Sequence, residues 1–202
     1  RMRQCMQSVN ENLVDREHRL IRLFDPPFND GPLDPGYIQG YVPGVRENGG
    51  QYTHAAVWAT MAFALLGENE TAWECFRMIN PVHLGSTADG MARYKVEPYV
   101  AAADVYGAPP HCGRGGWTWY TGSAGWMYRL IVETLIGLQL RDGVQLSFKP
   151  CVPDGWTRFK VNYRYHRSFY RIQFHVVGRP THHVGRVLVD GAEQHDRTIH
   201  LV

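Results

Sequence analysis

The stretch AAVWATMAFALLGENETAWECFRMINP, residues 55–81, sets the architecture of the first part of this chain. Residues 55–66 are nearly all apolar and predict a helix that Gly67 ends, while residues 68–80 predict a second helix that ends before Pro81. Because the connection between them is short, we expect an antiparallel helical hairpin. The surrounding fold should therefore be helical.

Helical spacing also occurs on both sides of this hairpin. Residues 2–13 carry apolar side chains on one stripe, and residues 123–138 repeat apolar side chains at helical intervals. Residues 91–106 are expected to be partly helical, with Pro98 near a helix start. A turn-rich stretch, residues 24–50, holds five of the twelve prolines and predicts a structured functional loop. Long loops between helices are the rule up to about residue 140.

Beyond Arg141 the period of the pattern changes to two. Residues 157–165 and 170–176 alternate apolar with polar side chains, which predicts two antiparallel strands joined near Arg167 and Ser168. Residues 187–189, followed by Asp190 and Gly191, predict a further strand and a hairpin turn. The tail is therefore expected to be a β-sandwich or part of one.

Composition narrows the classes of function. The chain has 202 residues, 44% of them hydrophobic, so it can bury a core, and its net charge of +2 argues against general binding of nucleic acid. The longest apolar stretch is too short to insert into a membrane. Four scattered cysteines favour a reduced, cytoplasmic chain. Because the chain opens at Arg1 within a helical pattern, we expect it to be a piece of a longer polypeptide.

The first candidate site is GRGGWTWYTGSAGW, residues 113–126. Thr121 and Gly122 lie where a helix is expected to begin, and free backbone N–H groups at such a terminus favour an anion. Arg114 can add a bidentate clamp, and aromatic side chains such as Trp119 suit the faces of sugar rings. The alternative is an ordinary helix cap with tight glycine packing.

The second candidate site is RENGGQYTHAAVW, residues 46–58. Arg46, Glu47, Gln51 and His54 crowd polar groups just before the apolar helix, so they are expected to line the rim at its N-terminal end. A histidine there can bind an anion or donate a hydrogen bond, although a structural role is the alternative.

Carboxylates and histidines suggest two further chemistries. Glu97 and Asp104 are candidate general acids, with structural salt bridges as the alternative. Ten histidines invite a metal hypothesis, but no HExxH or CxxC…H arrangement supports it, and none of them is proposed as a metal ligand. A GxSxG elbow for an acyl-transfer serine is also missing from the sequence.

Three strings together resemble the C-terminal part of glycoside hydrolase family 94: DPGYIQGYVPGVRENGGQYTHAAVW at 34–58, RYKVEPYVAAADVY at 93–106 and PPHCGRGGWTWYTGSAGW at 109–126. This family includes cellobiose and β-1,2-oligoglucan phosphorylases and the C-terminal region of cyclic β-1,2-glucan synthase; the β-1,2-glucan branch looks most similar. The resemblance implies a mainly α fold: the C-terminal part of an α/α six-hairpin barrel over residues 1–140, then a β-sandwich, jelly-roll-like domain over 141–202.

The resemblance also implies a reaction and its residues. Inorganic phosphate attacks the anomeric carbon of a β-linked glucan with inversion, giving α-glucose 1-phosphate, and no organic cofactor is needed. The family's phosphate-binding histidine matches His54, and its Thr-Gly pair matches Thr121 and Gly122. Its motifs place the other candidates near the substrate cleft with less specific roles: Arg46, Glu47, Gln51, Glu97, Arg114 and Trp119.

One departure from the family pattern limits this interpretation. The family's catalytic Asp lies in a DWNDG-like motif upstream of the ENGG segment, and no such motif occurs here. We therefore expect the upstream half of the same polypeptide to be a necessary partner, and the isolated chain to be inactive. A homodimer is a further expectation left open. The competing interpretation is a non-catalytic carbohydrate-binding or structural fragment, and complementation by a separate polypeptide is a third.

Overall fold

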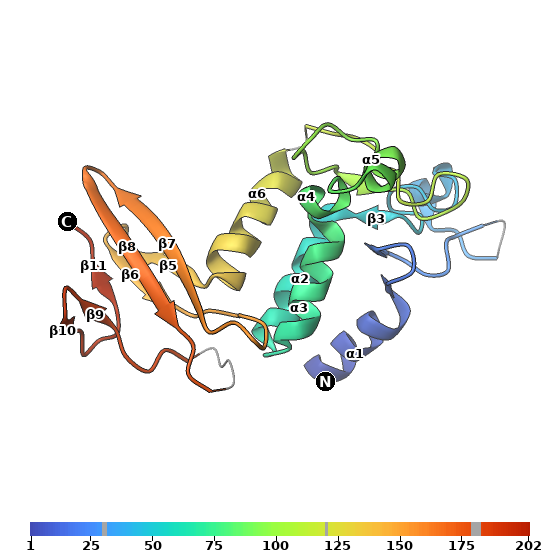
Figure 1. Cartoon of the computed structure of the whole chain (residues 1–202). Helices are drawn as coiled ribbons and strands as arrows, with labels where there is room; N and C mark the ends of the chain where they lie inside the picture. Colours follow the sequence, from blue (N-terminus) through green and yellow to red (C-terminus); the bar gives the residue numbers. More distant parts are fainter. Residues whose placement is uncertain (30–31, 120, 179–182) are drawn as a thin grey trace.

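The computed structural model describes residues 1–29, 32–119, 121–178 and 183–202, with the side chain of Thr121 also outside the described part. Helices gather on one side of the molecule, and the strands that follow residue 137 lie on the other (Figure 1). Six α-helices and several small antiparallel sheets lie within the described residues, so the fold is mixed. A mainly α chain was expected, and the share of strand is larger than that expectation allowed. The reason is that the long loops pair into short strands and the chain beyond residue 138 is strand-rich.

The predicted helical hairpin is present. Helix α2 spans Thr53–Leu65 and α3 spans Asn69–Ile79, with Gly67 in the left-handed region at φ 81° between them. Their facing side chains form the main core, in which Phe63 and Cys75 are fully buried. Helix α1, Met2–Asn12, adds Met6 and Val9 to the edge of this core. The apolar pattern of residues 55–80 therefore forms the centre of the helical part.

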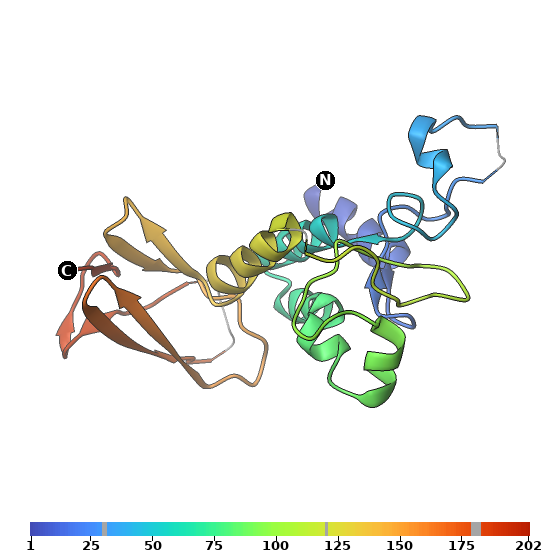
Figure 2. The ribbon, with the colours of Figure 1, turned by 90° about the horizontal axis from the view of Figure 1, so that it is seen from above.

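The third long helix is shorter than the sequence predicted. Helix α6 spans Thr121–Arg129 and continues as a π-helical segment over Leu130–Leu135, both packed against α2. The helix was expected to reach residue 138, but Leu138 already belongs to a strand because Gly137 takes a φ of 76° and turns the chain. In Figure 2 this helix lies between the helical and strand-rich parts.

The expectation of a helix starting near Pro98 is wrong. Helix α4, Pro81–Leu84, uses the proline at its first turn, and α5, Ala88–Tyr94, ends at Lys95, which adopts a left-handed conformation. From there the chain runs without regular structure to β4, Asp104–Val105. Pairing of β4 with β3, Gln51–Tyr52, outweighs helix formation in this stretch.

The strand-rich part has two main layers. One is the sheet β5-β6-β11, Leu138–Arg141, Gln145–Phe148 and Ile199–His200; the other is the hairpin of β7, Arg158–Tyr165, and β8, Ser168–His175. Apolar side chains of the hairpin such as Ile172 pack on this sheet around Leu146, which is fully buried. The alternation of residues 157–176 is confirmed, since burial alternates along both strands.

Two small hairpins complete the chain. Strands β1, Val14–Asp15, and β2, Leu20–Ile21, pair after α1, while β9, Leu188–Val189, and β10, Ala192–Glu193, pair near the C-terminus. The latter confirms the turn predicted after residue 189. A short 3-10 helix covers Gly36–Gly40 within the turn-rich stretch.

The segment that joins the two parts is held against α3. The indole Nε1 of Trp73 donates to the carbonyl of Cys151 at 2.6 Å, and Asn69 Nδ2 donates to the carbonyl of Val152 at 2.9 Å. The backbone N–H of Asp154 donates to the Glu70 carboxylate. These hydrogen bonds attach the start of the strand-rich part to helix α3.

Candidate functional site

The three motif-bearing strings meet in a small layer of paired backbone. Strand β3 pairs with β4, the N–H of Thr53 donates to the carbonyl of Ala103, and the N–H of Ala103 donates to the carbonyl of Trp117. Val105 also forms an isolated bridge with Gly115. Segments from residues 51–53, 103–105 and 115–117 therefore lie side by side. This arrangement brings the polar groups of all three strings to one end of α2 and α6.

His54 lies against the start of α6. A Cβ built on Gly122 would stand 3.6 Å from both Cε1 and Nδ1 of the His54 ring, which places that ring beside the backbone of the first helical turn. The two residues are 67 positions apart in the sequence, so only the fold brings them together. The side chain of Thr121 lies outside the described residues, although α6 begins at this residue. Two of the three predicted phosphate-binding positions therefore converge.

Aromatic rings hold the His54 side chain in place. Its ring packs edge to face on Trp58 at 4.7 Å between centroids and lies 5.8 Å from Trp126. Trp58 and Trp126 contact one another at 5.4 Å, and the Arg129 guanidinium lies over Trp126. The Nε2 atom of His54 is buried and has no hydrogen-bond partner within the described residues. Buried polar atoms are usually hydrogen-bonded, which makes this nitrogen a candidate contact for a ligand or an ordered water molecule.

A second group of polar side chains surrounds Trp117. The Arg46 guanidinium lies over its ring at 4.1 Å, and Glu47 forms an ion pair with Arg46 at 3.7 Å. Arg46 Nε and Glu47 Oε2 are buried and lack hydrogen-bond partners in the described part of the chain. Burial alone would lower the pKa of Arg46, but Tyr41 and Glu47 nearby outweigh it and raise that pKa. The arginine is therefore a permanent cation between Trp117 and Glu47.

Asp104 lies beneath this group as a buried carboxylate, only 2% exposed. Burial raises its pKa, and the N–H of Trp117, which donates to Oδ1 at 3.0 Å, partly opposes that effect. A Cβ on Gly116 would lie 2.5 Å from the same carboxylate, so the glycine allows the close approach. Asp104 fixes the Trp117 segment from within and does not face an open surface.

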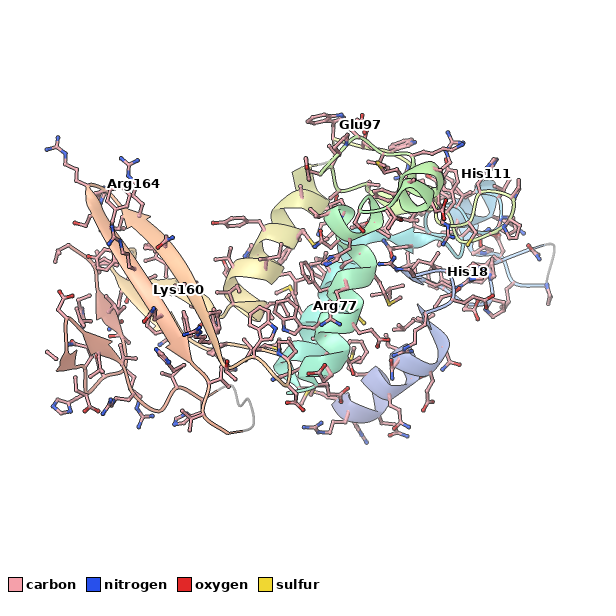
Figure 3. All side chains as sticks on the ribbon, in the orientation of Figure 1. His18, Arg77, Glu97, His111, Lys160 and Arg164 are labelled. Carbon is pink, nitrogen blue, oxygen red and sulfur yellow. The ribbon has the colours of Figure 1, made fainter. Side chains whose placement is uncertain are left out.

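Glu97 and Trp119 lie together on an exposed rim (Figure 3 labels Glu97). The Trp119 indole Nε1 donates to Glu97 Oε1 at 3.1 Å, and Trp119 is 75% exposed with a positive φ of 63°. Hydrogen bonds from its own backbone N–H and then from Trp119 lower the pKa of Glu97. Arg114 is exposed too, and its carbonyl accepts from the Tyr106 N–H. These residues form an outer surface near the motif layer.

Gln51 and Asn48 have structural partners. Gln51 is 1% exposed; its Oε1 accepts from the Ile21 N–H at 2.9 Å, and its Nε2 lies 3.4 Å from the Thr53 hydroxyl. Asn48, also 1% exposed, accepts from the Phe28 N–H and donates to the carbonyls of Phe28 and Tyr41. These amides hold the turn-rich loop against β2 and β3. Gln51 was predicted to line the substrate cleft, but its side chain is engaged inside the protein.

Trp58, Trp126 and Tyr41 are site neighbours that reasoning from the sequence did not single out as contacts of His54 or Arg46. Trp58 stands one helical turn after His54, so the (i, i+4) spacing was a signal that could have identified it. Tyr41 carries no such signal, because its ring reaches Arg46 only through the folding of the turn-rich loop.

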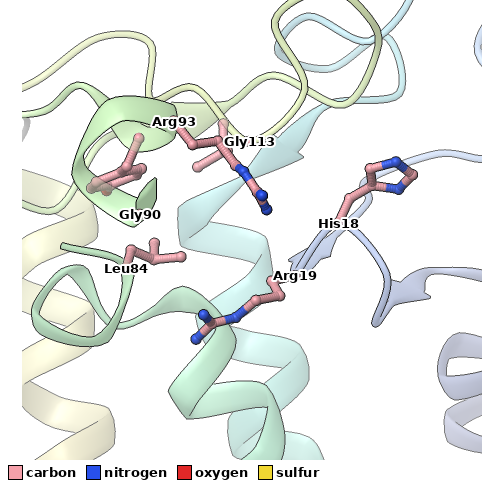
Figure 4. A pocket seen from close by; sticks show the side chains of 8 residues that line it. His18, Arg19, Leu84, Gly90, Arg93 and Gly113 are labelled. Atoms are coloured by element: carbon pink, nitrogen blue, oxygen red, sulfur yellow. The ribbon is translucent and has the colours of Figure 1, made fainter. Parts of the chain in front are cut away.

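A separate small cleft opens near the β1–β2 turn. It is lined by His18, Arg19, Leu84, Gly90, Arg93, Tyr94, Val105 and Gly113 (Figure 4). None of the predicted phosphate-binding residues is among those lining positions. Within the described residues there is no cluster of three or more His, Cys, Asp or Glu side chains able to hold a metal ion, and no helix there is long and apolar enough to cross a membrane.

Comparison with known proteins assigns the helical part to a family of catalytic domains, of which it is a fragment. Residues 1–137 match the model described as glycosyl hydrolase 94 superfamily, catalytic domain. This match covers more than half of the chain. The chain belongs to the glycosyl hydrolase 94 family.

Individual relatives agree with this assignment. The chain is 50% identical over 168 residues to the cyclic beta-(1,2)-glucan synthase NdvB of Rhizobium meliloti, covering 83% of this chain and 6% of that protein. It is 28% identical to the solabiose phosphorylase of Paenibacillus borealis, over 94% of this chain and 24% of the relative. It is 29% identical to the cellobionic acid phosphorylase of Neurospora crassa, over 75% of this chain and 19% of the relative. The chain thus spans less than a quarter of the length of these relatives.

Proposed function

We propose that this chain supplies the phosphate-binding part of an enzyme that cleaves β-linked glucans, with β-1,2 linkages as the preferred substrate, by inverting phosphorolysis. The observation that carries the proposal is the His54 ring lying 3.6 Å from a Cβ built on Gly122, at the N-terminal end of α6. A helix start offers free N–H groups and a positive dipole end, and the histidine adds a donor on the same side. Together they suit an oxyanion.

The proposed reaction exchanges one bond for another at a single carbon. An oxygen of inorganic phosphate attacks the anomeric carbon, the glycosidic C–O bond breaks with inversion, and the leaving oxygen takes a proton from a general acid. The products are α-glucose 1-phosphate and a glucan shorter by one unit, and no organic cofactor takes part. In this scheme His54, Thr121 and Gly122 hold the phosphate in line for attack, since fixed donors stabilise charge without rearrangement.

The general acid is proposed to come from an upstream Asp of the longer polypeptide. Two features of this chain support that assignment. Burial raises the pKa of Asp104, but this carboxyl group lies buried under Trp117, so it cannot reach a substrate to donate a proton. Glu97 is exposed, and hydrogen bonds lower its pKa, which favours the ionised form that has no proton to donate.

The sugar is proposed to lie across Arg46, Glu47, Trp117 and the rim of Glu97, Arg114 and Trp119. Arg46 Nε and Glu47 Oε2 face each other at 3.7 Å without a hydrogen bond, and both atoms suit hydroxyl groups, which can accept and donate at once. Similarity to a cyclic β-1,2-glucan synthase supports the β-1,2 linkage. We also propose that residues 1–140 complete an α/α barrel with preceding helices, that residues 141–202 form a separate β-sandwich domain, and that the protein works in the cytoplasm.

The test uses the longer polypeptide that includes the preceding part of the catalytic domain. It is incubated with β-1,2-oligoglucan in the presence or absence of inorganic phosphate, and α-glucose 1-phosphate is measured. We expect phosphate-dependent product that His54→Phe, which keeps a ring but no donor, reduces by roughly 10- to 150-fold, the range for losing one hydrogen bond to a charged group. Product formed equally well without phosphate would indicate hydrolysis, and no reaction with any β-glucan would refute the proposal.

A second candidate function is carbohydrate binding without catalysis. It is favoured by the aromatic rings on the outer surface, of which Trp119 is 75% and Tyr99 78% exposed. Calorimetry with glucan and with inorganic phosphate separates the two. Affinity for glucan without affinity for phosphate in the longer polypeptide would support the binding module instead of the phosphorylase.

A further inference from the structure

The strand-rich part carries a long run without acidic residues. Between Asp154 and Asp190 the sequence has no Asp or Glu, whereas it has seven Lys and Arg residues. Five of these cations belong to the β7–β8 hairpin and its turn. Residues 1–149 by contrast carry more acidic than basic groups, 15 against 13. The excess positive charge of the chain is therefore concentrated in one hairpin.

The pleat of this hairpin sorts its side chains onto two faces. The apolar set packs on the β5-β6-β11 sheet, and the other set is exposed along both strands. We call this exposed set the basic hairpin face; it consists of Arg158, Lys160, Asn162, Arg164, Phe169, Arg171, Gln173 and His175. Figure 3 shows Lys160 along the hairpin and Arg164 near its tip.

The cations of this face are not neutralised within the described residues. Register pairing sets Arg158 opposite His175, Lys160 opposite Gln173 and Arg171 opposite Asn162, so no carboxylate lies across the hairpin from any of them. Among the ion pairs that the described residues form, none involves Arg158, Lys160 or Arg171. Like charges held close on one face repel each other and are best relieved by an anionic partner.

We propose that the basic hairpin face docks on an anionic phospholipid surface. Cations spread along two eight-residue strands suit an extended, negatively charged plane. The tip adds an apolar contact, because Phe169 is 72% exposed and lies beside the Arg164 guanidinium at 5.5 Å. A basic surface combined with an exposed ring is typical of segments that bind at the membrane interface.

Nucleic acid is the other polyanion to consider, and the face suits it less well. Single strands bind by stacking bases on aromatic side chains. Phe169 is the one phenyl, phenol or indole ring of the basic hairpin face, so the face offers a single platform and no row of rings for successive bases. The docking inference rests on this face alone and is independent of the proposed phosphorolysis, since it uses none of the residues assigned to the phosphate or the sugar.

The test measures co-sedimentation of the full chain with vesicles. Vesicles of phosphatidylcholine alone are compared with vesicles that also contain phosphatidylglycerol, at low and high salt. We expect binding only to the anionic vesicles, weaker at high salt because charges are screened. The variant Lys160→Gln with Arg171→Gln should bind about 25-fold more weakly, since each basic residue near such a surface contributes roughly fivefold. Both side chains are exposed, so folding should be unaffected, which circular dichroism checks.

The matched control removes two exposed cations from the helical part, Arg1→Gln with Arg77→Gln, and should bind like the unchanged chain. Three results would overturn the proposal: no binding to anionic vesicles, equal binding to neutral vesicles, or an equal loss in the control variant. Binding of duplex DNA or single-stranded RNA at a salt concentration that abolishes vesicle binding would also overturn it, because the partner would then be a nucleic acid.

Discussion

The start of helix α6 offers a substitution that separates folding from ligand binding. Gly122 and Gly125 both lie in this helix, and replacing glycine by alanine in a helix favours folding by about 0.5–1 kcal/mol. A methyl group on Gly125 meets nothing within 4 Å. A methyl group on Gly122 would lie 3.6 Å from the His54 ring, an ordinary contact distance that causes no clash. Both variants should therefore fold.

The two variants should differ in phosphate binding. In Gly122→Ala the methyl group projects towards His54 and takes up space beside the backbone N–H groups that are proposed to hold the phosphate. Losing one hydrogen bond to a charged group weakens binding by about 1.5–3 kcal/mol, or roughly 10- to 150-fold. Gly125→Ala leaves that space unchanged, so its phosphate affinity should equal that of the unchanged protein.

The assay combines thermal melting of this chain with phosphate kinetics of the longer polypeptide. Gly125→Ala should raise the Tm by about 1–4 °C, and Gly122→Ala, closer to the helix end, by less. KM for phosphate should increase at least tenfold in Gly122→Ala alone. The proposed phosphate position is refuted if Gly122→Ala keeps the original KM, or if Gly125→Ala raises KM by the same factor.

Three further predictions concern stability and reactivity. Cys5 is exposed, whereas Cys75 and Cys151 are buried, and burial raises the pKa of these two thiols to about 12. A thiol reagent should therefore modify Cys5 first and the two buried thiols only after denaturant is added, and fast reaction of Cys75 would contradict this. Hydrogen bonds from Thr198 and then His200 lower the pKa of Asp196 from 3.8 to about 2, so its stabilising effect is present above pH 3.8 and lost as the pH falls towards 2. The denaturant midpoints of Asp196→Asn and of the unchanged chain should therefore converge as the pH falls from 3.8 towards 2. A constant difference between the two midpoints would contradict a stabilising role of the ionised carboxylate. Gly137 has φ 76°, and a Cβ there would stand 2.2 Å from the Lys149 backbone, whereas Gly143 has φ 71° and open space around it. In chemical denaturation Gly137→Ala should therefore lower the free energy of unfolding by about 2–5 kcal/mol and Gly143→Ala by only about 1–2 kcal/mol. Equal losses would disprove the role of the close contact.

Patterns within a few neighbouring residues determined the local structure correctly. The apolar run at 55–66, the glycine after it and the alternation at 157–176 predicted α2, α3, β7 and β8 within a few residues. These elements follow from side-chain periodicity, because each buries one face and the period of the pattern equals the period of the backbone. The motif strings likewise identified the family, which the match over residues 1–137 confirms.

The residues after Pro98 show where local patterns fail. Their composition allows a helix, but Ala103 donates to Trp117 and accepts from Thr53, partners 14 and 50 positions away. A hydrogen bond to a distant strand cannot be read from local spacing, so the extended conformation was missed. Gln51 was misread for the same reason, since its amide binds Ile21, a residue in a different hairpin.

The sequence by itself thus determined the family, the helical hairpin, the strand pair and the residue types available for an oxyanion. Only the tertiary structure decided that the His54 ring stands beside Gly122, that Arg46 covers Trp117, and that Asp104 is buried beneath them. The physical reason is the range of the interactions: helix and strand preferences act over a few residues, whereas these contacts join segments tens of residues apart and exist only once the core between α2 and α6 has formed.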